Sequence, residues 1–191
     1  MRSLKVNTAA AVPILTTAEA TTHLKVDTTA DDTYIDSLVL AATASAEMFT
    51  NRYFINTTVT QYNDHWREIE TLYKSNVSSI THIKYYDSDN SLQTLASSVY
   101  LLDDSAEPAR VSLDVSQDWP TIAGRKNAIE VKYIVGYGAA GSDVPDGIKQ
   151  AVLLIIGNWY QNRQSVVTGT IATELPLNSQ YLLEQYKVLV C

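Results

Sequence analysis

Apolar residues are most concentrated near the C-terminal end of the chain, in the run PDGIKQAVLLIIGNWYQNR from Pro145 to Arg163. Their spacing predicts a long helix, because residues three and four apart share one helical face. Pro145 suits the first turn of this helix, since its fixed φ is already helical. One face carries Ile148, Ala151, Val152, Ile155, Trp159 and Tyr160, and the opposite side is also apolar through Leu153, Leu154 and Ile156.

A helix that is apolar around most of its circumference has to be covered from several directions. The simplest interpretation is a buried core helix, and the alternative is a helix that a neighbouring subunit covers in part. The run is too short and too interrupted to span a membrane, which needs ~20 apolar residues. Seven side chains are therefore candidates for the core or a subunit interface: Ile148, Val152, Ile155, Trp159 and Tyr160 for the core, with Leu153 and Ile156 toward a second layer or a neighbouring subunit.

Two short helices are expected near the ends of the chain. Thr16 and Glu19 have the spacing of a capping box, in which each side chain satisfies a free amide of the first turn. This box predicts a helix over Thr17–Leu24. A last short helix is expected over Asn178–Tyr186.

A longer helix is expected to begin at Asp31–Asp32 and to end near Asn51–Arg52. Alanines and serines across 41–46 would let another helix approach closely. Its polar face should be wet or meet something polar. The apolar positions at helical spacing are Ile35, Leu38, Val39, Ala42, Ala46 and Phe49, and the polar positions opposite are Asp36, Thr43 and Glu47.

The middle of the chain has strand character, because threonine, tyrosine and valine become frequent from Asn56 in short alternating runs. Asp87–Asn90 indicates a hairpin turn between two such runs. Residues 1–13 have no comparable pattern and are expected to form a loosely held arm. The predicted strands cover Thr57–Tyr62, Ile69–Tyr73, Ile80–Tyr86, Val99–Leu102, Ala109–Leu113 and Ile129–Tyr137, the last being the clearest.

These elements predict an α+β fold, in which a small helical bundle built from the N- and C-terminal helices carries an inserted antiparallel β lobe. The whole chain, 1–191, is expected to be a single domain. Within it we place the N-terminal helices at 14–55, the inserted β lobe at 56–138, and the long helix, a loop and the closing helix at 143–191. The loop at 164–176 is polar and β-branched, and it is expected to be mobile or ordered only by a partner.

Composition narrows the possible environments and partners. The chain is 46% hydrophobic, which suffices for a core, and its net charge of −7 argues against a basic face for nucleic acid. The single Cys191 excludes an internal disulfide and a zinc site made of several cysteines. No long apolar leader begins the chain. We therefore expect a soluble protein that is made in a reducing cytoplasm and has no membrane partner.

One motif invites a nucleotide-binding interpretation. Residues 136–141, GYGAAG, match GxGxxG between a predicted strand and a predicted helix. However, this strand is the last of the β series, whereas a dinucleotide fold needs a second parallel strand after the helix. Pro145 also starts the helix well beyond the third glycine. A flexible turn is therefore favoured, and a nucleotide-dependent enzyme is kept as a distant alternative.

Other chemistry is poorly supported. The acidic turn at Asp87 resembles a calcium loop, but Leu92 and Ser98 occupy the positions that require glycine and a bidentate glutamate. Neither a phosphate-binding Walker loop nor a nucleophile elbow occurs. We expect no metal, no cofactor and no enzymatic activity. The three histidines, His23, His65 and His82, lie on different predicted elements.

The order of four segments resembles the head-to-tail connector proteins of tailed bacteriophages, also called adaptor or head-completion proteins, in particular the subgroup with a β insertion. LTTAEATTHLKVD leads into DDTYIDSLVLAATASAEMFTNR, similar to the opening helix pair of that family. ITHIKYYDSDNSLQTL is similar to its hairpin. VKYIVGYG then runs into VPDGIKQAVLLIIGNWYQNR, which is the most specific part, and ELPLNSQYLLEQYKV resembles its closing segment.

This resemblance implies a structural virion protein that forms a ring, usually of twelve copies, beneath the portal. Packaged double-stranded DNA would pass through the centre without sequence-specific contacts, and a stopper or tail-completion protein would dock below. The expected location is the neck between capsid and tail, after assembly in the host cytoplasm. As a further hypothesis, the closing segment docks on the portal through Leu177, Leu182, Leu183 and Tyr186.

Two other classes of protein stay open. The chain could be another phage neck or tail-completion protein in which the β lobe dominates. It could also be a β-rich binding module that recognises a small ligand or glycan through its tyrosine-rich sheet.

Overall fold

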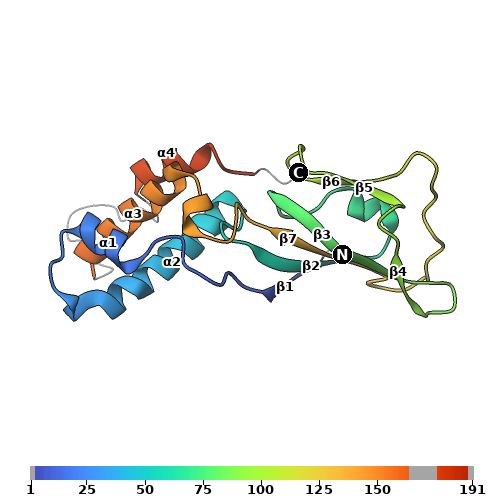
Figure 1. Cartoon of the computed structure of the whole chain (residues 1–191), viewed down its shortest axis with the longest axis horizontal. Coiled ribbons are helices and arrows are strands. Elements are labelled where there is room, and N and C mark those ends of the chain that lie inside the picture. Colours follow the sequence, from blue (N-terminus) through green and yellow to red (C-terminus); the bar gives the residue numbers. More distant parts are fainter. Residues whose placement is uncertain (1–2, 164–175, 189–191) are drawn as a thin grey trace. The chain divides into compact units, whose positions relative to one another are not determined.

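The computed structural model describes residues 3–163 and 176–188, which form two compact units (Figure 1). A helical unit contains residues 11–55 together with the described part of 138–187. A β unit contains residues 3–10, 56–137 and Val188. The α+β class is thus confirmed, with helices from both ends of the chain in one unit and four of the five strands of the antiparallel sheet inserted between them in sequence, while β1 precedes the first helix. That both units belong to a single adaptor domain stays a prediction.

The helical unit contains α1 (Thr17–Leu24), α2 (Asp32–Thr50), α3 (Asp146–Gln161) and α4 (Leu177–Glu184). The predicted capping box is present, because the Thr16 amide donates to Glu19 Oε2 at 2.7 Å and the Glu19 amide donates to Thr16 Oγ1 at 3.2 Å. Helix α2 ends at Asn51, whose left-handed φ of 56° is a conformation that asparagine tolerates. Capping and helical spacing therefore place these elements close to their predicted bounds.

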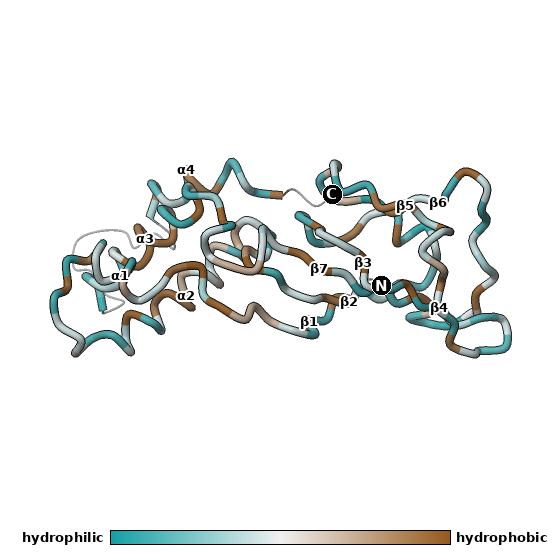
Figure 2. Tube along the Cα trace, in the orientation of Figure 1, coloured by the Kyte–Doolittle hydropathy of each residue, from teal (hydrophilic) through white to brown (hydrophobic). Residues whose placement is uncertain are grey.

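The core of the helical unit is apolar. Helix α2 packs against α1, α3 and α4, and α3 also packs against α1 and α4. Hydrophobic stretches run along α2 and α3 in Figure 2. The buried positions on these two helices are Ile35, Leu38, Val39, Ala42, Ala46 and Thr50 on α2, and Ile148, Ala151, Val152, Ile155 and Ile156 on α3. Thr50 was not among the predicted positions, and the predicted Phe49 is only half-buried.

The β unit is built on a five-stranded antiparallel sheet with the order β1-β2-β7-β3-β4. Its strands are β1 (Ser3–Thr8), β2 (Thr57–Asn63), β3 (Val77–Tyr86), β4 (Leu92–Leu95) and β7 (Ile129–Val135), and a second sheet pairs β5 (Tyr100–Asp103) with β6 (Arg110–Leu113). The central strand β7 alternates as predicted, because every second residue is buried while Glu130 and Lys132 lie on the other face. The β3–β4 hairpin turns where it was expected, at Asp87, whose Oδ1 accepts from the amides of Asp89 and Ser91.

Two predictions for the β unit were wrong. The N-terminal arm is not loose, because β1 pairs with β2 along the sheet edge, with Leu4 opposite Gln61 and Val6 opposite Val59. The predicted strand over 69–73 does not form, because Trp66–Glu70 is a 3-10 helix that buries Ile69 and Thr71 makes an isolated bridge with Arg110. Ile69 and Leu72, the two residues of this run without exposed surface, are three positions apart, a spacing that suits a 3-10 turn and not the alternation of a strand.

Candidate functional site

Helix α3 places its candidate residues at two depths. Ile148, Val152, Ile155 and Ile156 have no exposed surface, so all four belong to the core of a single chain. Ile156 consequently has no free surface for a neighbouring subunit. Leu153, Trp159 and Tyr160 are half-buried, so parts of these side chains face outward from the helical unit.

The end of α3 is tied to the start of α2. The Tyr160 hydroxyl donates to Asp31 Oδ2 at 2.6 Å, and Arg163 Nη2 donates to the same oxygen at 2.8 Å. The Arg163 guanidinium also lies 4.7 Å from the ring centre of Tyr34. The hydrogen bond from Tyr160, and then that from Arg163, lowers the pKa of Asp31, while the bond to Asp31 raises the pKa of Tyr160. The Tyr160 hydroxyl therefore links the end of α3 to the start of α2 within one chain.

Helix α4 divides the predicted portal-docking residues. Leu183 is fully buried, and Leu182 and Tyr186 are half-buried, with the Tyr186 carbonyl accepting from Arg52 Nε at 2.5 Å. Leu177 is 65% exposed, and Tyr181, which was not among the predicted residues, is 79% exposed. Of the four predicted side chains, Leu177 is thus the most accessible to a partner. Helical spacing had selected the side of α4 that packs against its own bundle.

The glycine turn between β7 and α3 is filled by a side chain of the same chain. Asp143 Oδ2 accepts from the Ala140 amide at 2.9 Å. A Cβ on Gly138 would clash with that same oxygen, so only glycine fits there. The Asp143 carboxylate thus already accepts from the Ala140 amide, a backbone donor of this turn that a bound phosphate would otherwise use. The strand before the turn belongs to an antiparallel sheet, which also disagrees with a dinucleotide fold.

A groove of about 620 Å³ opens on the helical unit between α1 and α3. Its charged groups Lys149, Asp146 and Glu19 all have partners, since Lys149 Nζ lies 2.8 Å from Asp146 Oδ1 and the amide and hydroxyl of Thr16 donate to Glu19. These contacts lower the pKa values of both carboxyls: Thr16 is the main cause at Glu19, and Lys149 at Asp146. Among the remaining lining residues are Leu15, Ala18, Thr22, Gln150 and Leu153.

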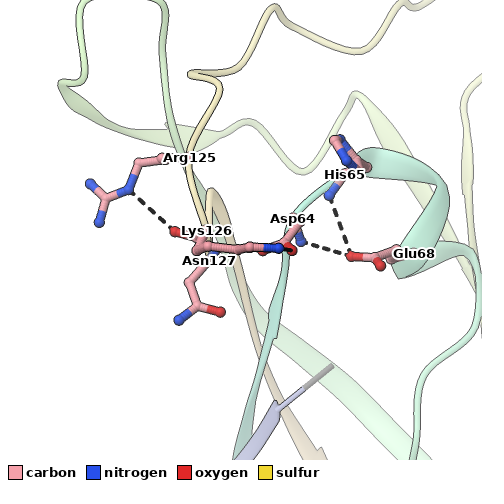
Figure 3. Close-up of polar contacts among 6 residues, drawn as sticks. All are labelled: Asp64, His65, Glu68, Arg125, Lys126 and Asn127. Atoms are coloured by element: carbon pink, nitrogen blue, oxygen red, sulfur yellow. Dashed lines mark hydrogen bonds and ion pairs between the residues drawn. The ribbon is translucent and has the colours of Figure 1, made fainter. Parts of the chain in front are cut away.

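A second hollow, of about 410 Å³, lies in the β unit beside Asp64. Figure 3 shows the polar contacts of Asp64. Asp64 Oδ1 accepts from the Asn127 amide at 2.8 Å, and Oδ2 accepts from Lys126 Nζ at 3.0 Å. The hydrogen bond from the Asn127 amide, and after it that from Lys126, lowers the pKa of Asp64 to about 2. The Asp64 amide in turn donates to Glu68 Oε2 at 2.7 Å.

We call Asp64, Lys126 and Asn127 the Asp64 cluster. It fastens the long loop before β7 to the end of β2. The same loop is held by Trp66, whose Nε1 donates to the Pro120 carbonyl at 2.7 Å and whose ring stacks on Trp119 at 4.6 Å. These contacts join residues more than fifty positions apart, so no local sequence pattern could have revealed them. The cluster is a structural fastening and contains no arrangement of nucleophile and base.

Two further features are absent from residues 3–163 and 176–188. No three histidine, cysteine or acidic side chains there are grouped so that they could hold a metal ion. No helix in that part of the chain combines the length and apolarity needed to cross a membrane.

Comparison with protein families decides the assignment. The family described as head completion protein matches residues 13–174, which is most of the chain. The chain belongs to the head completion protein family. Membership confirms the resemblance seen in the sequence and the expectation of a structural protein of phage-like particles.

Solved structures share the fold of this head completion protein over nearly its whole length. A chain in the neck of an empty GTA particle, computed with C6 symmetry, matches with a TM-score of 0.79 and 23% identity, covering 99% of this chain and 97% of that one. A chain in the virion of a native gene transfer agent (GTA) particle gives 0.79 and 23%, covering 98% and 96%. A chain in the neck of a native GTA particle, computed with C12 symmetry, gives 0.71 and 23%, covering 98% and 97%. No curated protein matches the chain.

Proposed function

We propose that this head completion protein is the ring-forming adaptor in the neck of a phage-like particle, where it joins the portal to the tail side and lines the DNA exit channel. The observation that carries the proposal is the fold shared with GTA neck chains over 98–99% of this chain, combined with the family match. Those particle necks were computed with C6 and C12 symmetry. A ring of about twelve copies, as the sequence resemblance implies, is compatible with both.

The charge of the chain suits a channel through which DNA slides. Dense lysine and arginine would hold phosphates through counterion release and would resist sliding. The net charge is −7, and several cations are already held by carboxylates of the same chain. These pairs are Lys126 with Asp64, Lys149 with Asp146 and Arg163 with Asp31.

Imaging of particles that carry a tagged copy of the chain tests the proposal. A small tag inserted beside Val115, which is 97% exposed, leaves the cores of both units intact. Density for the tag is expected in the neck, between portal and tail. Particles that lack the protein are expected to have heads without attached tails and to lose packaged DNA. A position on the tail side of another adaptor would identify a tail-completion protein instead, and absence from the neck would refute both.

Docking of α4 on the portal is a further part of the proposal. Deleting α4 is a poor test, because the deletion removes buried Leu183 and damages the helical core. The double variant Leu177→Asp/Tyr181→Asp changes only exposed side chains of α4. Capture by immobilised portal is expected to fall at least tenfold, whereas Leu101→Asp, at a half-exposed leucine of the β unit, should bind as the parent does. Equal capture of all three proteins would show that α4 does not dock there.

A further inference from the structure

Helix α2 has an exposed face that differs from an ordinary solvated helix surface. We call this face the α2 ridge, which consists of Ser37, Leu40, Ala41, Ala44 and Met48. Leu40 is 64% exposed and Met48 is 81% exposed. Residues 37–46 contain no charged side chain, although exposed helix faces normally carry charge. Adjoining exposed apolar side chains of this kind mark protein contacts more often than solvent-facing surface.

The small residues of the α2 ridge set how closely another surface can approach. Ala41 and Ala44 lie between the two large side chains Leu40 and Met48, so the ridge has a low middle section. Small residues at a helix contact reduce the distance between the packed elements. From Ser37 to Met48 the ridge is about 17 Å long at 1.5 Å per residue, which suits the buried centre of a standard interface.

The α1–α3 groove has the complementary properties. It is concave, and its apolar lining includes Leu15, Ala18 and Leu153. Its charged groups are already satisfied, because Lys149 is bonded to Asp146 and Glu19 to Thr16. An uncharged ridge can therefore enter without breaking an ionic hydrogen bond, whereas a charged surface would lose solvation without gaining a partner.

The positions of the two surfaces fit head-to-tail association. The α2 ridge lies on the side of α2 opposite the buried residues that pack against α1 and α3. It shares no residue with the α1–α3 groove, and both belong to the helical unit. A ring with cyclic symmetry requires two different complementary surfaces on each subunit, whereas a two-fold dimer uses one surface twice.

We infer that the α2 ridge of one copy packs into the α1–α3 groove of the next copy around the ring. This inference rests on the proposed adaptor function and adds the identity of the subunit interface. It assigns Leu153 to a contact between copies, and it leaves Ile156 in the core. The occupant of the groove is thus a second copy of this chain, and neither the portal nor a tail protein.

Thiol crosslinking tests the inference directly, because the chain has only one cysteine. In a Cys191→Ser background, Ala44→Cys labels the ridge and Gln150→Cys labels the groove. The double variant and each single variant are assembled into particles and treated with a short bismaleimide. The double variant is expected to give a ladder of multimers, and each single variant should stay monomeric.

Each outcome of the crosslinking has a defined meaning. Dimers from Ala44→Cys alone would show that ridge meets ridge, and crosslinks from it to another protein would show a different occupant, so either result overturns the inference. Rings that are visible in the particle neck but give no ladder from the double variant also overturn it, while the adaptor function stands. If the chain is missing from the neck, the proposed function itself fails.

Charge substitution gives an independent measurement. Leu40→Glu/Met48→Glu introduces two carboxylates that would be desolvated in the groove. Ring yield in particles or with added portal is expected to fall at least tenfold, with an unchanged helical circular-dichroism spectrum of the separated chain. Val115→Glu, at an exposed valine of the β unit, is the matched control and should assemble normally. Normal ring yield from the double glutamate variant would overturn the inference.

Discussion

The two units differ in what their buried polar side chains do. In the helical unit, the buried Thr50 and Ser179 donate to carbonyls three or four residues away, those of Ala46 and Pro176, whereas Gln61 of the β unit, also without exposed surface, bonds to another segment. In the β unit, Gln61 Oε1 accepts from the Tyr73 amide at 3.0 Å and from the Tyr133 hydroxyl at 3.2 Å. Its Nε2 donates to Asn63 Oδ1 at 3.0 Å. Packing of apolar side chains, which is non-directional, thus fills most of the interior of the helical unit, whereas the interior of the β unit also contains directional bonds between segments through Gln61.

The surfaces of the two units differ in how their exposed apolar side chains are distributed. Exposed apolar side chains of the helical unit include Leu40 and Met48, which share one face of α2, whereas those of the β unit, such as Leu92 and Val115, lie on separate elements. Scattered exposed apolar residues need no special explanation, but a continuous face does. The helical unit is therefore the part suited to packing against copies of itself.

The largest expected effect comes from the apolar core of the helical unit. Ile155→Ala removes a fully buried side chain from α3 and should lower the free energy of unfolding by about 2–5 kcal/mol, because it leaves a cavity. Urea unfolding of the dissociated chain, followed at 222 nm, measures the change in the helices. Leu40→Ala, at an exposed position of α2, is the control and should change the stability by less than about 0.5 kcal/mol.

The tryptophans sharpen this test, because Trp66 and Trp119 belong to the β unit and Trp159 belongs to the helical unit. In a Trp159→Phe background, fluorescence excited selectively at tryptophan reports only on the β unit, because both remaining tryptophans lie there. If the two units unfold separately, Ile155→Ala should shift the helical transition and leave the fluorescence transition in place. Equal shifts of both signals would show that the units unfold together. The difference between their cores would then not give the two units separate free energies of unfolding.

A smaller effect is expected from the polar interior of the β unit. Gln61→Leu keeps much of the side-chain volume but removes the shared acceptor of Tyr73 and Tyr133, so stability should fall by about 1–3 kcal/mol. Fluorescence-detected unfolding in the Trp159→Phe background measures this loss. Gln117→Leu, in an exposed loop of the same unit, should be nearly neutral. An unchanged midpoint for Gln61→Leu would mean that packing alone stabilises both units.

The same contrast explains which parts of the fold could be predicted from the sequence. Helix bounds followed from the capping pair Thr16 and Glu19 and from apolar spacing, and strand β7 followed from strict alternation, because these signals are local. The edge strand β1 had no such signal, since Leu4 is the only half-buried residue in it and the others are exposed. The buried position of Gln61 was equally invisible, because its partners lie on other segments.

The candidate interfaces show a second limit of sequence patterns. Apolar spacing identified Ile156 and Leu183 as candidate contact residues, yet both are buried within the chain itself. Leu40, which is 64% exposed, was missed because it lies outside the apolar face of α2 that spacing selects. Periodicity finds the side of a helix that packs first, which is the side toward its own bundle. A face used between copies has to be found from its exposure in the folded chain.

The smallest effect at neutral pH is expected at the Asp64 fastening of the β unit, where it appears as a dependence on pH. The folded-state pKa of Asp64, about 2, lies below the ordinary value of 3.8, so its ionised form stabilises the fold. This contribution is complete above about pH 4 and is lost as the pH falls toward 2. The melting temperature of Asp64→Asn should therefore lie below that of the parent at pH 5–7, and the difference should close between pH 4 and 2.

Other carboxyls with lowered pKa values, such as Asp31 and Asp146, are common to both proteins and cancel in the difference. Asp118→Asn, in the same loop but exposed, is the control and should melt with the parent throughout. A difference that widens in acid would show that the Asp64 carboxylate does not stabilise the β unit through Asn127 and Lys126. The hydrogen bonds of Gln61 would then be the remaining evidence that directional bonds stabilise this unit.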